Sequence, residues 1–244
     1  MKSNIKVIIP ALNEENAISK VIKEIPEFVD EIIVIDNGSI DNTSVLAKEF
    51  GATVLHENKK GYGYACLKGL NYIRNLKDRT DVIVFLDGDY SDYPNQMPKL
   101  ISPIIYDNFD FVLGSRKQIL SEKGAMNFHQ RFGNWLATTL MSLLFKSKFT
   151  DLGPFRAIKY DVLQKLNMCD KTYGWTVEMQ LKILKHKYKY LEVPVKYRNR
   201  IGVSKVSGTL KGSIFAGIKI LTWIFKYMQP IQQHFLPCRK HQNH

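Results

Sequence analysis

Two aspartates separated by one glycine, Asp87 and Asp89, follow the apolar run VIVFL at residues 82–86. A continuous run of β-branched and apolar residues is typical of a strand that is buried on both faces. Side chains two positions apart along a strand point the same way, so the two carboxylates should lie together. Neighbouring carboxylates repel each other unless a cation lies between them. Mg²⁺ and Mn²⁺ accept such oxygen ligands and often share them with substrate phosphates. The pattern therefore predicts a metal and diphosphate site at the edge of a sheet.

The elements that must position this pair alternate between strand and helix patterns. Strands are expected at residues 5–9, 31–35, 53–56, 82–86 and 111–114, and helices at 17–25, 41–50, 63–75 and 97–106. Strand–helix alternation predicts an α/β, Rossmann-like fold with a mostly parallel sheet between layers of helices. Ligands of such folds bind outside the carboxyl ends of the strands. Polar clusters follow three of the expected strands, at residues 13–15, 36–37 and 87–89.

The second half of the chain is less regular. Helices are expected at residues 132–145 and 177–187, a short strand near 158, a strand at 190–195 and a Gly/Ser-rich basic loop at 201–209. Residues 211–228 project as an amphipathic helix with Lys211, Lys219 and Lys226 along one edge. Such a helix suits a membrane interface, and docking on the protein core or on a partner subunit is the alternative.

We therefore expect one catalytic domain at residues 1–209, an interfacial helix at 210–228 and a disordered tail at 229–244. Residues 1–117 form the donor half of that domain and 118–209 the acceptor half. The 244 residues carry a formal net charge of +12, which fits a solvated lysine surface, an anionic membrane face or phosphate substrates. No nucleic-acid-binding module is recognisable. Three scattered cysteines and the lack of a visible signal peptide favour a cytoplasmic location.

Four segments in this order resemble the family 2 glycosyltransferases of the GT-A fold: PALNEE (10–15), VIDNGSIDN (34–42), GYGYA (61–65) and LDGD (86–89). Later segments resemble the dolichyl-phosphate mannosyl- or glucosyltransferase branch: LGSR (113–116), VPV (193–195) and RNRIGVSK (198–205). The resemblance implies an inverting, Mg²⁺- or Mn²⁺-dependent enzyme. It would transfer a hexose from a UDP- or GDP-sugar to a polyprenyl (dolichyl or undecaprenyl) phosphate on the inner face of the cytoplasmic membrane.

The resemblance also implies residue roles. Asp87 and Asp89 would bind the metal, and the nucleotide sugar would be held by Pro10, Ala11, Asn13, Glu15, Asp36, Lys60, Gly61, Asp87 and Arg116. Turn formation and helix capping are the alternatives for the acidic members of that set. Some members of the branch place a glutamine ligand two residues after the second aspartate. Ser91 stands there in this chain, so the third protein ligand stays open.

The acceptor phosphate would be held by Arg131, Asp151, Arg200, Ser204 and Lys205, with Asp89, Arg200 and Lys205 acting in catalysis. A phosphate is already anionic and attacks without a protein base, whereas a hydroxyl acceptor requires one. Glu178 and Asp151 are the candidates for that base, with helix capping or pairing with lysine as their alternative. A hydroxyl acceptor in cell-wall or exopolysaccharide assembly therefore stays open. So do a nucleotidyltransferase, a non-catalytic membrane-binding scaffold, and the oligomeric state.

Overall fold

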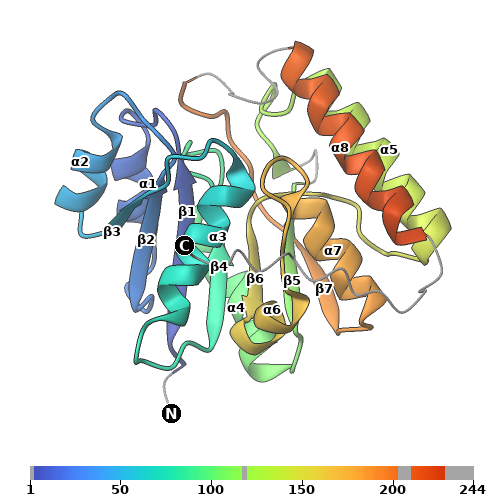
Figure 1. Cartoon of the computed structure of the whole chain (residues 1–244), viewed down its shortest axis with the longest axis horizontal. Coiled ribbons are helices and arrows are strands. Elements are labelled where there is room, and N and C mark those ends of the chain that lie inside the picture. The colour runs from blue at the N-terminus through green and yellow to red at the C-terminus, as the bar shows by residue number, and fades with distance from the viewer. Residues whose placement is uncertain (1–2, 117–119, 203–209, 229–244) are drawn as a thin grey trace, which may run out of the picture.

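A computed structural model describes residues 3–116, 120–202 and 210–228 of the chain. Its centre is a seven-stranded sheet in the order β3-β2-β1-β4-β6-β5-β7 (Figure 1). The strands are β1 (Ile5–Ala11), β2 (Glu31–Asp36), β3 (Thr53–His56), β4 (Val82–Phe85), β5 (Phe111–Ser115), β6 (Arg156–Lys159) and β7 (Tyr190–Pro194). Strand β6 runs antiparallel to β4 and β5, and the other pairs are parallel. The predicted α/β fold with a mostly parallel sheet is confirmed.

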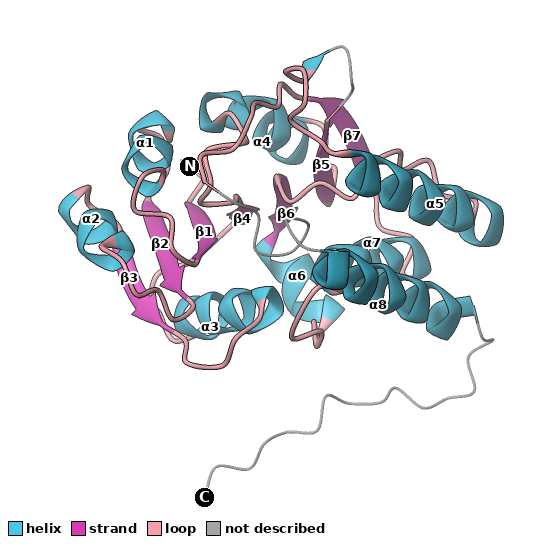
Figure 2. Cartoon of the chain, turned by 90° about the horizontal axis from the view of Figure 1, so that it is seen from above, coloured by secondary structure: helices cyan, strands magenta, loops and turns pink. Residues whose placement is uncertain are grey.

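Both faces of the sheet are apolar because successive strand side chains alternate between them. In β1, Ile8 belongs to one buried cluster, while Val7 and Ile9 belong to the other. Helices α1 (Ile18–Glu24), α2 (Thr43–Glu49) and α4 (Met97–Tyr106), the last preceded by a short 3₁₀ helix η1 (Pro94–Gln96), cover the face of Val7. Helices α3 (Tyr62–Arg74), α6 (Tyr160–Leu166) and α7 (Trp175–Lys185) cover the opposite face (Figure 2). This sandwich leaves the carboxyl ends of the parallel strands exposed at one edge.

Two longer helices, α5 (Phe128–Phe145) and α8 (Leu210–Met228), lie side by side beyond the sheet (Figures 1 and 2). Helix α8 docks on the core through the buried side chains of Trp223 and Ile224. Its outer side exposes Phe215, Ile218, Phe225 and Met228. The predicted amphipathic helix is thus present, with one side seated on the protein. Among the described helices, none combines the length and the apolar character needed to cross a bilayer.

Three local predictions differ from the structure. Helix α5 begins at Phe128, four residues before the predicted start at residue 132, because Asn127 and Gln130 form a capping box there. Helix α6 was not predicted, since it directly follows β6 without a turn signal. Strand β4 ends at Phe85 rather than residue 86, so Asp87 and Asp89 lie in the following loop. The predicted tail at 229–244 falls outside the described residues.

Candidate active site

The loops after β1 and β2 are tied together at the carboxyl edge of the sheet. Asn13 adopts a positive φ of 53°, its backbone N–H donates to Ser39 Oγ, and its side-chain oxygen accepts from Ile40 N. Glu15 Oε2 accepts from Asn42 N at 3.1 Å. The predicted donor residues Asn13 and Glu15 therefore hold the loop that would face a nucleotide. Pro10 and Ala11 end β1, beside Ile35 and Asp36 of β2.

Asp36 ends β2 and is almost fully buried. Ser39 N donates to its Oδ1 at 2.7 Å, and the hydroxyl of Ser44 donates to its Oδ2. Burial raises the pKa of Asp36, but the hydrogen bonds from Ser44 and Ser39 outweigh it and the net pKa is lowered. The side chain is thus an anion that already organises its own turn. Its predicted contact with the nucleotide stays a prediction.

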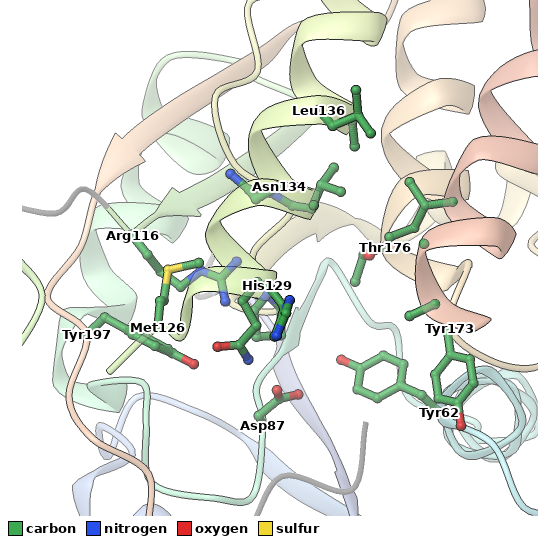
Figure 3. A pocket seen from close by; sticks show the side chains of 18 of the residues that line it. Tyr62, Asp87, Arg116, Met126, His129, Asn134, Leu136, Tyr173, Thr176 and Tyr197 are labelled. Carbon is green, nitrogen blue, oxygen red and sulfur yellow. The ribbon is translucent and has the colours of Figure 1, made fainter. Parts of the chain in front are cut away.

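The start of α3 brings a glycine against the loop before α7. Gly61 has a φ of 146°, and a Cβ there would lie 2.3 Å from the carbonyl oxygen of Lys171, so another residue would be strained as well as crowded. Its N–H donates to Asn37 Oδ1 at 2.8 Å. Lys60 is exposed beside it. Tyr62, which sequence reasoning missed, opens α3 and lines the same cavity as Asp87 (Figure 3).

Asp87 and Asp89 both line a cavity of about 330 Å³. Asp87 Oδ1 is buried and has no hydrogen-bond partner among the described residues. Burial, together with the negative charge of Asp89, raises the pKa of Asp87 to about 7, although Arg200 and Arg116 act in the opposite direction. An unpartnered buried carboxylate oxygen beside a second carboxylate is the arrangement that a divalent cation would stabilise. The pair therefore fits a metal site.

Ser91 orients the second carboxylate. Both its N–H and its hydroxyl donate to Asp89 Oδ1, at 2.9 and 2.5 Å. Nearby Asp92 is 1% exposed, and neither of its carboxylate oxygens has a partner in the described part of the chain. Burial, and then the charges of Asp87 and Asp89, raise the pKa of Asp92 well above its usual range. Even so, no three His, Cys, Asp or Glu side chains of the described residues cluster as metal ligands. Substrate oxygens and water would have to complete the coordination.

The segment before residue 202 runs alongside the metal-site loop. Arg198 N donates to Ser91 O and Ile201 N donates to Asp89 O, both at 2.9 Å. This pairing brings Arg200 opposite Asp89, with 3.1 Å between Arg200 Nη1 and Asp89 Oδ2. Two predicted site residues from opposite halves of the chain are thus in contact.

Arg198, the first residue of the segment RNRIGVSK, makes structural contacts. Its guanidinium lies 3.2 Å from the ring centroid of Tyr90 and 4.2 Å from that of Tyr93, and it pairs with Glu24 at 2.8 Å. Stacking and ion pairing of this kind suit the planar guanidinium group. Arg198 therefore fastens the 197–201 segment to the loop after Asp89.

Arg116 and Asp151 form a buried bidentate pair. Asp151 Oδ2 accepts from Arg116 N and Nε, and Asp151 Oδ1 accepts from Arg116 Nη2 at 2.7 Å. Burial raises the pKa of Asp151, but Arg116 outweighs it and the net pKa is lowered. The oxygens of Asp151 are thus engaged by Arg116, which Asp151 orients toward the cavity. A carboxylate bound in this way is a poor proton acceptor. Arg131 is exposed on the first turn of α5, and His129 and Gln130 line the cavity in its place.

Glu178 does not fit the role of a catalytic base. Its side chain is fully buried, and it accepts from Cys169 N at 2.9 Å and from Asp170 N at 2.7 Å. It also pairs with Lys182 one helical turn later, at 2.6 Å. These contacts stabilise the loop before α7, and Glu178 is not among the residues that line the cavity. Predicted residues Ser204 and Lys205 lie outside the described residues.

The cavity has a mixed lining. Its charged groups are Asp87, Asp89, Arg116 and Arg200. Aromatic and polar side chains of Tyr62, His129 and Tyr173 also line it (Figure 3). Small and apolar residues of α5 and α8, with Leu152, line the part that we call the apolar channel: Leu136, Ala137, Ala216, Gly217, Ile220 and Leu221. A single ligand with an anionic head and an apolar tail would match both kinds of lining.

A mixed seven-stranded sheet with paired aspartates at its carboxyl edge defines a nucleotide-sugar transferase of the GT-A type. The model of glycosyl transferase family 2 matches residues 6–166, and the chain belongs to that family. The fold is also similar to glucosyl-3-phosphoglycerate synthase of Mycobacterium tuberculosis solved with Mn²⁺, UDP and phosphoglyceric acid. Their TM-score is 0.74 and their identity 21%, over 94% of this chain and 80% of that one. That synthase has also been solved with Mg²⁺ and UDP.

Two curated relatives are similar over most of their length. The UDP-N-acetylglucosamine–dolichyl-phosphate N-acetylglucosaminyltransferase of Methanococcus voltae is 31% identical over 214 residues, covering 79% of this chain and 84% of the relative. The undecaprenyl-phosphate mannosyltransferase of Micrococcus luteus is 27% identical over 229 residues, covering 88% and 92%. Membership of the family confirms that the chain is a glycosyltransferase.

Proposed function

We propose that the protein transfers a hexose from a UDP- or GDP-sugar to the phosphate of a polyprenyl phosphate, with inversion at the sugar. The observation that carries this proposal is the cavity, which joins two carboxylates and two arginines to an apolar channel between α5 and α8. A polyprenyl phosphate combines an anionic head with an apolar tail. A sugar that offers a hydroxyl group as acceptor has no such tail to bind in the channel. The relatives from Methanococcus and Micrococcus are named for acceptors of this class.

Mg²⁺ or Mn²⁺ held by Asp87 and Asp89 would neutralise charge on the diphosphate as the leaving group departs. The protein's own groups serve the other substrate. Arg116, aimed into the cavity by Asp151, presents a rigid fork suited to a phosphate. A phosphate oxygen can attack the anomeric carbon without losing a proton, so no protein base is needed. That agrees with the structural contacts of Glu178 and Asp151 described above. Arg131, Ser204 and Lys205 remain part of the proposed acceptor set.

A membrane surface would supply such an acceptor. Helix α5 exposes Phe128, Phe132, Trp135 and Leu143, and α8 exposes Phe215, Ile218, Phe225 and Met228. Amphipathic helices with aromatic residues bind membrane interfaces, and a net charge of +12 favours anionic lipid. The proposed location is therefore peripheral, on the inner face of the cytoplasmic membrane. A lipid phosphate could then enter the cavity between the two helices without leaving the interface.

The test is to incubate the purified full chain with radiolabelled UDP- and GDP-sugars, Mn²⁺ or Mg²⁺, and polyprenyl phosphate in vesicles. Metal-dependent label in the lipid fraction is the expected result, and Asp89→Asn is the matched inactive control. Label transferred only to added sugar hydroxyls would overturn the acceptor. Release of pyrophosphate from a nucleoside triphosphate and a sugar phosphate would indicate a nucleotidyltransferase instead. Vesicle binding with no metal-dependent nucleotide binding would indicate a scaffold.

A further inference from the structure

The guanidinium of Arg200 contacts the carboxylate of Asp89, which is a proposed metal ligand. Asp89 Oδ1 accepts from the N–H and hydroxyl of Ser91, and Oδ2 lies 3.1 Å from Arg200 Nη1. Asp89 lines the cavity but is only 4% exposed, and both of its oxygens already have partners among the described residues. A cation that binds Oδ2 would therefore compete with the guanidinium.

The contacts of Arg200 hold its guanidinium in place but leave it able to move. Its Nη2 lies 3.4 Å from Glu14 Oε1, at the long limit of a hydrogen bond, and its Nε is buried without a partner among the described residues. Arg198 in the same segment makes two ring stacks and a 2.8 Å ion pair. The segment is thus fastened at Arg198, while the side chain of Arg200 has only longer contacts. Arg200 also lines the cavity, so its guanidinium has open space to move into.

We propose that Arg200 is an internal counter-cation, which neutralises Asp89 until a metal-bound diphosphate replaces it and frees the guanidinium for a phosphate in the cavity. The physical reason is charge. Without a cation, Asp87 and Asp89 repel each other in a buried site, and a guanidinium relieves that repulsion. A divalent ion relieves it more strongly, and the displaced arginine then adds positive charge where an acceptor phosphate would bind. Metal binding would thereby prepare the acceptor site, which favours binding of the donor before the acceptor.

The inference rests on the metal site of the proposed function, and its first step, displacement of Arg200 from Asp89, does not involve the acceptor, so the test is metal binding alone. Mn²⁺ binding to the full chain, without nucleotide, is measured by electron paramagnetic resonance of the free ion and by calorimetry. In Arg200→Ala the competing cation is gone, and Mn²⁺ should bind about tenfold more tightly than to the wild type, given the strength of charge contacts at partly buried sites. Lys196→Ala, which removes an exposed lysine of the same segment, is the matched control and should leave the affinity unchanged.

Chemical rescue separates a local contact from a general change of charge. Guanidinium ion at millimolar concentration should weaken Mn²⁺ binding to Arg200→Ala back toward the wild-type value, whereas Na⁺ at equal ionic strength should not. Arg200→Lys keeps the charge and should bind Mn²⁺ with intermediate affinity, which gives a second readout if the alanine variant folds poorly. Equal or weaker Mn²⁺ binding by both variants would overturn the inference and leave the glycosyl transfer untouched. No Mn²⁺ binding by any of the proteins, even with UDP, would overturn it together with the metal dependence of the proposed function.

Discussion

A substitution of Gly217 tests whether the apolar tail of the acceptor binds in the apolar channel. Gly217 lies on α8 and lines the cavity, and a Cβ built there meets no heavy atom within 4 Å. The first carbon of a leucine side chain at this position would therefore meet no protein atom, and the side chain would occupy space at the cavity wall. Glycine is the poorest ordinary helix former, so Gly217→Leu should also raise the free energy of unfolding by about 0.5–1 kcal/mol. For a domain of this size that is a rise of about 1–3 °C in Tm.

The same side chain should weaken acceptor binding. It would displace about four carbon atoms of a lipid tail, and burial of each CH₂ contributes ~0.8 kcal/mol, or roughly 3 kcal/mol in all. Ordering of the tail on binding offsets part of this gain. We therefore expect the KM for a long polyprenyl phosphate to rise about tenfold or more, with an unchanged KM for the donor. A five-carbon prenyl phosphate buries far less of its tail than a long polyprenyl phosphate, so its KM should rise much less.

The assay is transfer of labelled sugar at varied acceptor concentration, in the same vesicles for every variant. Thr222→Leu is the matched control, because it adds the same side chain to an exposed position of α8 outside the cavity. Gly133→Leu enters the cavity from α5, again with no atom within 4 Å of its Cβ, and should reproduce the effect. A folded Gly217→Leu enzyme whose KM for the long acceptor equals that of the wild type would refute the channel as the acceptor site.

Three further outcomes follow from contacts elsewhere. Asp89→Asn should abolish the rise in Tm that UDP and Mn²⁺ together produce in the wild type, and a retained rise would exclude Asp89 as a ligand. Asp151→Ala leaves Arg116 buried without its bidentate partner, so urea unfolding should show a loss of about 3–5 kcal/mol. A loss below ~1 kcal/mol would contradict that structural role. Burial raises the pKa of Glu31, but the hydrogen bonds to its carboxylate, of which the one from Lys6 has the largest effect, outweigh burial. The net pKa of Glu31 is therefore lowered. The stability from this lowered pKa is present above the pKa of the unfolded chain and is lost as pH falls through the folded value. Glu31→Gln should therefore flatten the acid limb of unfolding free energy against pH below about 4.5, and an unchanged limb would contradict this.

The sheet was predictable because its signals are local. The apolar runs predicted as strands match β1, β2, β4 and β5 to within two residues, and polar clusters follow the first three of these. The insertion of β6 between β4 and β5 in the antiparallel sense has no such signal. Its partners are chosen by contacts between distant parts of the chain, and a four-residue strand carries too little pattern to specify them. The short helix α6 was not predicted either, because no turn signal separates it from β6.

The contacts between the predicted site residues could not be predicted from the sequence. Arg200 and Asp89 both stood in the predicted set, but their contact depends on backbone hydrogen bonds between residues 197–201 and 89–92. Backbone hydrogen bonds between two loops do not depend on residue type, so the sequence does not reveal them. Glu178 is a different case, because its ion pair with Lys182 agrees with the alternative of a lysine partner that the sequence offered. Only the three-dimensional fold brings the amides of Cys169 and Asp170 to it.

The family match ends before some of the residues that are proposed to bind the acceptor. The match covers residues 6–166, which contain the six strands β1 to β6, apart from Ile5, and both aspartates. Arg200 and the channel wall on α8 lie beyond it. Under the proposed function, the residues proposed for the metal and the donor lie in the matched part, whereas Arg200 and the α8 wall of the proposed acceptor site lie outside it. Exchanging residues 167–228 with a relative that uses another acceptor should accordingly change the acceptor and leave metal-dependent binding of the donor in place.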